Sequence, residues 1–181
     1  QRLVQRGLSL AREHGFPLYS VQGAIVQSCV MLQCGELQEG LTAIAEALSA
    51  YRATDAQLLL PFFLASLAEG YLQVGSIPEG LQVVEEALQL TATNIDRFWE
   101  AELYRLKGEL SLQSRPGEAK SRVSLRRSKG KSAVTNPHAE AEAEACFHKA
   151  IEVARQHGAK SLELRAVMSL SRLWQQQGKN A

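Results

Sequence analysis

Histidines are the first side chains to consider for chemistry, because an imidazole can bind a metal ion or transfer protons near neutral pH. The sequence contains four, and no two have the spacing of a metal-binding pair: His14, His138, His148 and His157. His14 and His157 occupy equivalent places, three residues after an alanine and directly before a glycine. We therefore expect these rings at helix ends, near terminal carbonyls, and predict no metal site.

The cysteines are the next candidates, as nucleophiles or zinc ligands. Cys29, Cys34 and Cys146 form an odd number at no recognised ligand spacing. Cys29 and Cys34 are five residues apart, which does not place both on one face of a helix. All three are interpreted as small apolar side chains of a protein in a reducing compartment.

Phosphate binding and acid–base catalysis have only weak candidates. Gly130-Lys131-Ser132 resembles the end of a phosphate-binding loop, but Leu125 stands where that loop requires its first glycine. One acidic pair and one acidic triplet have the spacing of exposed helical faces: Glu85 and Glu86, and Glu140, Glu142 and Glu144. We therefore predict neither a catalytic site nor a bound cofactor.

Trp99 and Trp174 have rings that could stack on a ligand. Trp174 occupies the same repeat position as Tyr71, where a side chain packs against the next helix, so a core role is favoured. Trp99 lies at a helix start, and both interpretations stay open for it.

Composition indicates a helical protein with no preference for polyanions. Hydrophobic residues make up 45% of the chain, aromatic residues 6%, and the net charge is +1. A charge near zero argues against nucleic acid and anionic membranes as partners. The longest apolar stretch, 58–68, is about half the length that a membrane-spanning helix needs.

An internal repeat of forty residues organises the sequence. Gly35 and Gly75 each close an apolar run, and the segments that follow them align without a gap. Ala143 and Phe147 then have the spacing of Gly80 and Val84, once 23 residues, 116–138, are removed.

A second match supports this register independently. Residues 11–15 (AREHG) recur as 154–158 (ARQHG), a displacement of 143 residues that equals three steps of forty plus the insert. The insert 116–138 is basic and rich in glycine, serine and proline, so we expect it to be disordered. Contact with nucleic acid or acidic protein is the alternative for this segment.

Each repeat contains two helices with an apolar face. We expect eight in all, over 1–14, 17–34, 37–53, 57–74, 77–93, 97–114, 139–157 and 160–177. Short glycine-containing links make neighbouring helices antiparallel, with left-handed caps at Gly35 and Gly75. The predicted fold is all-α, a single domain over 1–181 built as a right-handed α-solenoid of antiparallel helix pairs. A long coiled coil conflicts with the regular glycines, and a closed four-helix bundle would not require the repeat.

The repeats resemble the tetratricopeptide family in their small residues and in Tyr71, Gly80, Val84 and Ala87, although the usual period is about 34 residues. The longer period is similar to that of maltose-regulon-type transcription activators. Residues 97–110, 145–151 and 160–166 resemble a signature of one bacterial group. In that group a nucleotide cyclase-like or other output domain precedes a predicted ATPase and a C-terminal repeat arm.

The resemblance implies a bacterial cytoplasmic regulatory protein of which this chain is the non-enzymatic repeat arm. The sequence also starts without a methionine, inside a helical pattern, so we expect it to be part of a longer chain. In tetratricopeptide stacks the first helix of each pair lines a concave groove. Repeat positions place twelve residues there: Gln22, Ile25, Cys29, Phe62, Ala65, Glu69, Glu102, Arg105, Glu109, Arg165, Met168 and Arg172.

Two functions fit such a groove. The favoured hypothesis is a protein-interaction arm that binds an extended peptide or another domain of the parent protein. The alternative is an arm that senses a small-molecule effector and regulates an attached ATPase or transcription regulator.

Overall fold

The computed structural model describes residues 2–93, 97–114 and 136–179, and all regular secondary structure within these ranges is helical, as predicted. Eight α-helices follow one another without a strand among the described residues. Their bounds are α1 (Arg2–Glu13), α2 (Pro17–Gln33), α3 (Leu37–Arg52), α4 (Leu60–Val74), α5 (Ile77–Thr93), α6 (Glu100–Gln113), α7 (Pro137–Gln156) and α8 (Lys160–Gln176). None of these helices is long and apolar enough to span a membrane.

Five helices end in turns of the same construction, each with a glycine of positive φ: Gly15, Gly35, Gly75, Gly158 and Gly178. The first four turns join consecutive helices, and Gly178 follows α8. At Gly75 the φ angle is 77°, and the N–H of Ser76 donates to the carbonyl of Tyr71 at 3.0 Å. The same bond, from the residue after the glycine to the residue four before it, recurs at the other four. The predicted left-handed caps are confirmed, because only glycine adopts this conformation without strain.

Helices α4 and α6 begin three residues later than the sequence suggested, at 60 and 100 rather than 57 and 97. Leu59 has a φ of 67°, which no helical residue adopts, and Pro61 follows in the first turn of α4. The hydroxyl of Tyr51 donates to the carbonyl of Leu58 at 3.1 Å and holds this connection against α3.

Helix α7 begins two residues earlier than predicted. Asn136 caps it by accepting a hydrogen bond from the N–H of His138 at 3.2 Å, and Pro137 occupies the first turn. Residues 136–138, which the sequence assigned to the disordered insert, thus form the start of this helix. The rest of that predicted insert lies in 115–135, outside the described residues.

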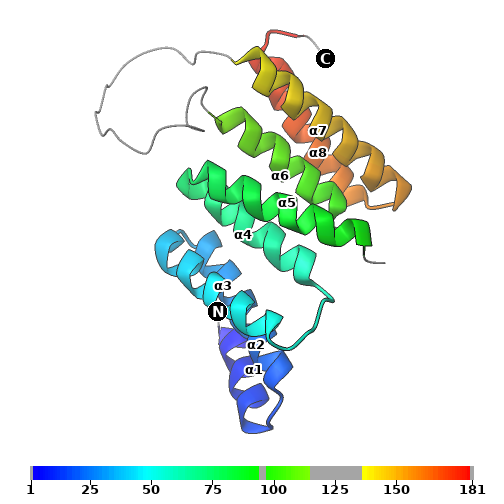
Figure 1. Cartoon of the computed structure of the whole chain (residues 1–181). Coiled ribbons are helices and arrows are strands. Elements are labelled where there is room, and N and C mark those ends of the chain that lie inside the picture. Colours follow the sequence, from blue (N-terminus) through cyan, green and yellow to red (C-terminus); the bar gives the residue numbers. More distant parts are fainter. Residues whose placement is uncertain (1, 94–96, 115–135, 180–181) are drawn as a thin grey trace, which may run out of the picture.

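Each helix packs against the next one along the chain. Alternate helices also contact one another in one set only: α2 contacts α4, α4 contacts α6, and α6 contacts α8. Among the described residues, α1, α3, α5 and α7 make no contact with one another. Figure 1 shows the helices in chain order from α1–α3 at one end of the molecule to α7 and α8 at the other. The chain thus contains the helix pairs α2–α3, α4–α5 and α6–α7, followed by α8. The first helices of the pairs, together with α8, form one continuous row, α2, α4, α6 and α8.

The core runs through the stack between the helix pairs. One apolar cluster joins α2 to α6, and a second joins α6, α7 and α8 around Phe147. Gly108 of α6 lies so close to Phe147 that an added Cβ atom would be 2.5 Å from the ring. Trp174 packs on this second cluster and donates its indole N–H to Glu144 of α7 at 2.8 Å. Trp174 thus has a packing role, as predicted, but it is half-buried and contacts the preceding helix, α7, rather than a following one.

Candidate interaction surface

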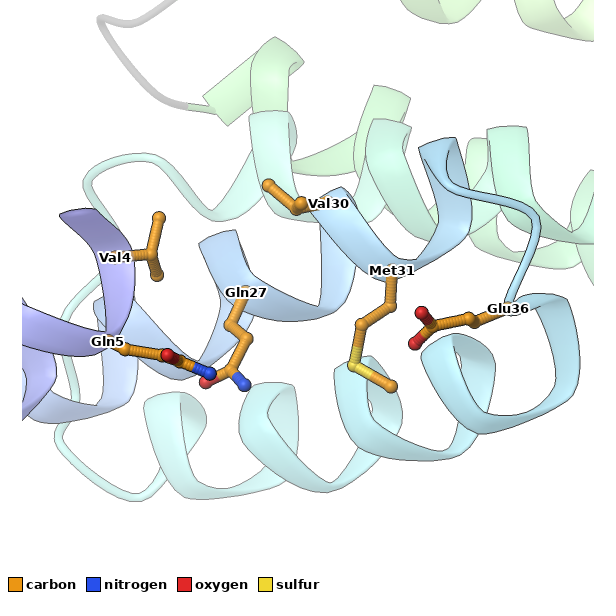
Figure 2. Close-up of a pocket in the computed structure, with 6 residues that line it drawn as sticks. All are labelled: Val4, Gln5, Gln27, Val30, Met31 and Glu36. Carbon is orange, nitrogen blue, oxygen red and sulfur yellow. The ribbon is translucent and has the colours of Figure 1, made fainter. Parts of the chain in front are cut away.

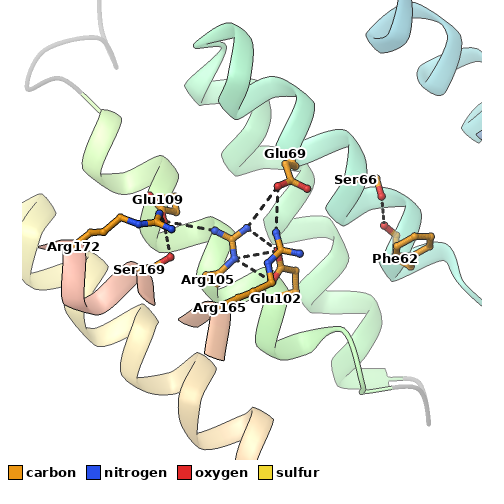
Figure 3. Close-up of polar contacts among 9 residues, drawn as sticks. All are labelled: Phe62, Ser66, Glu69, Glu102, Arg105, Glu109, Arg165, Ser169 and Arg172. Atoms are coloured by element: carbon orange, nitrogen blue, oxygen red, sulfur yellow. Dashed lines mark hydrogen bonds and ion pairs between the residues drawn. The ribbon is translucent and has the colours of Figure 1, made fainter. Parts of the chain in front are cut away.

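The row of first helices carries three sets of equivalent positions that the sequence singled out. Four residues of the first set, one on each helix, are Gln22, Phe62, Glu102 and Arg165. Because α2, α4, α6 and α8 contact one another in order, these positions follow one another across the row. Six of the twelve predicted groove residues form a connected ion-pair network on α4, α6 and α8 (Figure 3).

Arg105 is at the centre of this network. Its Nη2 lies 2.6 Å from Glu102 Oε1, and its Nη1 lies 3.6 Å from Glu109 Oε1, both on α6. Its Nη2 is also 4.0 Å from Glu69 Oε1 on α4. Only 7% of Arg105 and 4% of Glu102 are exposed, so this pair is removed from water. Burial favours the neutral form of Arg105, but the bond with Glu102 and the charges of Glu102, Glu69 and Glu109 outweigh it and raise the pKa.

Two arginines of α8 complete the network from the other side. Arg165 Nη2 lies 3.0 Å from Glu102 Oε1 and 3.3 Å from Glu69 Oε1, so one guanidinium joins three helices. Arg172 Nη1 is 3.8 Å from Glu109 Oε1, and the Arg172 side chain is 61% exposed. The network therefore contains three acids and three arginines, and their charges cancel. The two arginines of α8 lie on its solvent side.

An aromatic cluster lies at the starts of α4 and α6. The rings of Phe62 and Trp99 are 4.5 Å apart, and Phe98 meets Trp99 edge-on at 5.3 Å. Phe98 is 45% exposed, while Phe62 and Trp99 are half-buried. Aromatic pairs favour such offset and edge-on arrangements, and part of the apolar surface of Phe98 stays exposed.

The remaining predicted groove residues differ in their exposure. Ile25 is 0% and Ala65 4% exposed, so both belong to the core rather than to an open surface. Met168, at the same repeat position, is 47% exposed. Gln22 and Cys29 are half-buried, and burial raises the pKa of the Cys29 thiol, which a hydrogen bond with Ser66 lowers by less.

Ser169 contacts the ion-pair network but was not among the predicted residues. Its hydroxyl donates to Glu109 Oε1 at 2.6 Å, from a residue that is 3% exposed. The sequence could have indicated this role, because Ser169 is four residues after Arg165 and three before Arg172. This spacing places all three residues on one face of α8. Trp99 was considered, but its contact with Phe62 required the structure.

One hollow, of about 200 Å³, lies between α1 and α2 and is lined by Val4, Gln5, Gln27, Val30, Met31 and Glu36 (Figure 2). A hollow of about 30 Å³ lies at Cys29, Ser66 and Glu69. No group of histidine, cysteine or acidic side chains in this part of the chain is arranged to hold a metal ion.

Comparison with known proteins adds no assignment. No protein-family model matches the chain, and no curated protein is similar to it.

Proposed function

We propose that this chain is a tetratricopeptide-like α-solenoid that binds a protein segment on the surface formed by α2, α4, α6 and α8. The observation that carries the proposal is the one-sided contact between alternate helices: first helices touch one another and second helices do not, within the described part of the chain. A stack whose first helices are closer together curves toward them, and extended peptides bind on such concave surfaces.

The side chains on this surface favour a partner with two features. The ring cluster of Phe62, Phe98 and Trp99 offers an apolar site for an aromatic or aliphatic side chain. Arg172, mostly exposed and 3.8 Å from Glu109, offers a charge for an acidic group. A peptide or neighbouring domain with an apolar anchor and an acid at the other end fits this pattern.

On the sequence resemblance, we propose that this arm belongs to a multidomain signalling protein, where it regulates an attached ATPase or cyclase-like domain. In that setting the partner is another domain of the same protein or a client protein. Binding, rather than catalysis, is the role that we assign to residues 1–181.

Photo-crosslinking tests the proposal and identifies the partner in the same experiment. A photoreactive amino acid replaces Arg172 in α8 of one variant and Gln82 in α5 of another, and both are irradiated in the native host. We expect specific protein adducts from position 172 and not from position 82, which is exposed on a second helix. Equal adducts from both positions would remove the first-helix surface from consideration. Retention of a metabolite instead of a protein would favour the effector-sensing alternative.

A further inference from the structure

The last turn of each helix in the row α2, α4, α6 and α8 carries an exposed glutamine at the same repeat position. The four residues are Gln33, Gln73, Gln113 and Gln176. Each lies four residues after the groove position that is shared by Cys29, Glu69, Glu109 and Arg172. Because residues four apart lie on one face of a helix, the glutamines extend the proposed binding surface by one turn.

The exposure of this position does not depend on the neighbouring repeat. Helix α4 contacts α2 on one side and α6 on the other, and Gln73 is nevertheless exposed. Gln33 and Gln113 are exposed as well, although another helix of the row follows each of them. The glutamines therefore belong to the lasting surface of the row.

The amide groups of these glutamines are available to a partner. None of the four side chains forms a hydrogen bond with another described residue. In contrast, Gln156 and Gln177 donate side-chain hydrogen bonds to glutamates of α7. A primary amide both donates and accepts, as a peptide bond does, so an amide repeated along the row is suited to a main chain rather than to one particular side chain.

The spacing of the glutamines fits one conformation of a bound peptide. Gln33 and Gln73 line the same small hollow, together with Ser66 and Glu69. The axes of packed helices are about 8–10 Å apart. A peptide in the polyproline II conformation rises about 3.1 Å per residue and has three residues per turn, so equivalent backbone groups recur about every 9 Å. Its N–H and C=O groups form no internal hydrogen bonds and remain free for the glutamines.

We propose that the four glutamines hydrogen-bond the main chain of a peptide in the polyproline II conformation, which crosses the row from α2 to α8. Each glutamine contacts one residue in three, so the site spans about ten residues. This inference rests on the peptide-binding role proposed above and specifies what is recognised at this end of the helices, namely the backbone. Arg172, one turn before Gln176, supplies a contact with an acidic side chain.

Peptides selected from a random twelve-residue library against the 181-residue chain supply the probe. Titration calorimetry with a selected peptide compares the parent chain with the double variant Gln73→Ala, Gln113→Ala. The variant should raise the dissociation constant about tenfold or more, because two hydrogen bonds are lost. The matched control Gln38→Ala, Gln82→Ala removes two exposed glutamines from the second helices α3 and α5 and should change it less than about twofold. Circular dichroism should show equal helicity for all variants.

Ester substitution in the probe tests the backbone contacts themselves. An ester in place of one peptide bond removes one N–H donor. The loss of affinity should recur at every third residue, and two of these losses should disappear in the variant Gln73→Ala, Gln113→Ala. Losses that recur at every second residue, or that are the same in both proteins, would overturn the inference.

The variant Arg172→Glu distinguishes failure of this inference from failure of the proposed function. A probe that Arg172→Glu weakens and the double glutamine variant does not weaken would overturn the inference and leave the proposed surface in place. A library that yields no binder, or only binders that are sensitive to neither change, would overturn both.

Discussion

Arg105 and Glu102 lie side by side on α6, and both reach charged groups on neighbouring first helices. A buried charge requires a partner, so the removal of either residue alone leaves the other with only its longer or more exposed ion pairs. Their spacing of three residues predicted that they share a helical face. It did not predict their burial, which depends on α4 and α8 covering α6.

The position shared by Ile25, Ala65, Arg105 and Met168 shows why the sequence could not separate groove from core. The first three are 0%, 4% and 7% exposed, and only Met168, on the last helix, is open at 47%. This position is buried wherever a further helix pair follows. Exposure therefore depends on the neighbouring repeat and not on the residue type.

The first prediction concerns the buried pair. Replacing Arg105→Met should lower the free energy of unfolding by about 2–4 kcal/mol, because Glu102 then keeps only Arg165 as a cationic partner. Adding Glu102→Leu should recover at least half of that loss, since two apolar side chains need no ion pair. Urea unfolding of the three proteins measures both effects. A double variant less stable than Arg105→Met would show that the acid has another role.

The second prediction concerns acid stability. Hydrogen bonds from Trp174 and Lys179 lower the pKa of Glu144. A carboxyl group whose pKa is lower in the folded chain stabilises the fold at pH values above its pKa in the unfolded chain, about 4.5. This contribution is lost as the pH falls through the pKa of the folded chain. Glu144→Gln should therefore be less stable than the parent at pH 7, and this difference should shrink as the pH falls below about 4.5. Thermal unfolding followed by Trp174 fluorescence in a Trp99→Phe background measures the difference. A difference independent of pH would contradict it.

At the scale of the elements, the glycines predicted where helices end. The caps at Gly35 and Gly75 were predictable because a glycine after an apolar run ends a helix in the left-handed conformation. The starts of α4 and α6 were not predictable. Leu59 adopts a positive φ, which leucine rarely does, so its sequence gives no sign of the turn.

The third prediction tests the close contact of α6 and α7. Gly108→Ala should lower the free energy of unfolding by about 1–3 kcal/mol, because the new methyl group overlaps the ring of Phe147. Gly7→Ala in α1, with no atom within 4 Å of the added Cβ, should instead stabilise the chain by about 0.5–1 kcal/mol. Opposite signs in thermal unfolding support the packing described. Equal effects would mean that α6 and α7 do not approach this closely.

At the scale of the whole molecule, the sequence predicted the number, order and pairing of the helices. Each repeat buries its apolar face on the next, so patterns forty residues apart define neighbours in space. The forty-residue spacing of equivalent positions continues after the predicted 23-residue insert, because the helices on either side of it, α6 and α7, pack together as a pair. The identity of a partner does not follow from such packing, since the same core supports different surfaces.

The fourth prediction tests this register. Replacing residues 116–135 by a short glycine-containing linker should leave helicity unchanged and the melting temperature within about 5 °C, because shortening a loop has a small effect on closure entropy. Asn136 is kept because it caps α7. Unfolding of the deletion variant would show that the segment is structural and that the third repeat is not one interrupted pair.

The affinity of the crosslinked partner for two matched variants tests the central claim, that the first helices form the binding surface. Arg172→Glu on α8 and Lys149→Glu on α7 change the charge equally, at side chains that are 61% and 43% exposed. Titration calorimetry should show the dissociation constant raised about tenfold or more by Arg172→Glu and changed less than about twofold by Lys149→Glu. Equal losses, or a loss confined to Lys149→Glu, would place the partner elsewhere on the molecule.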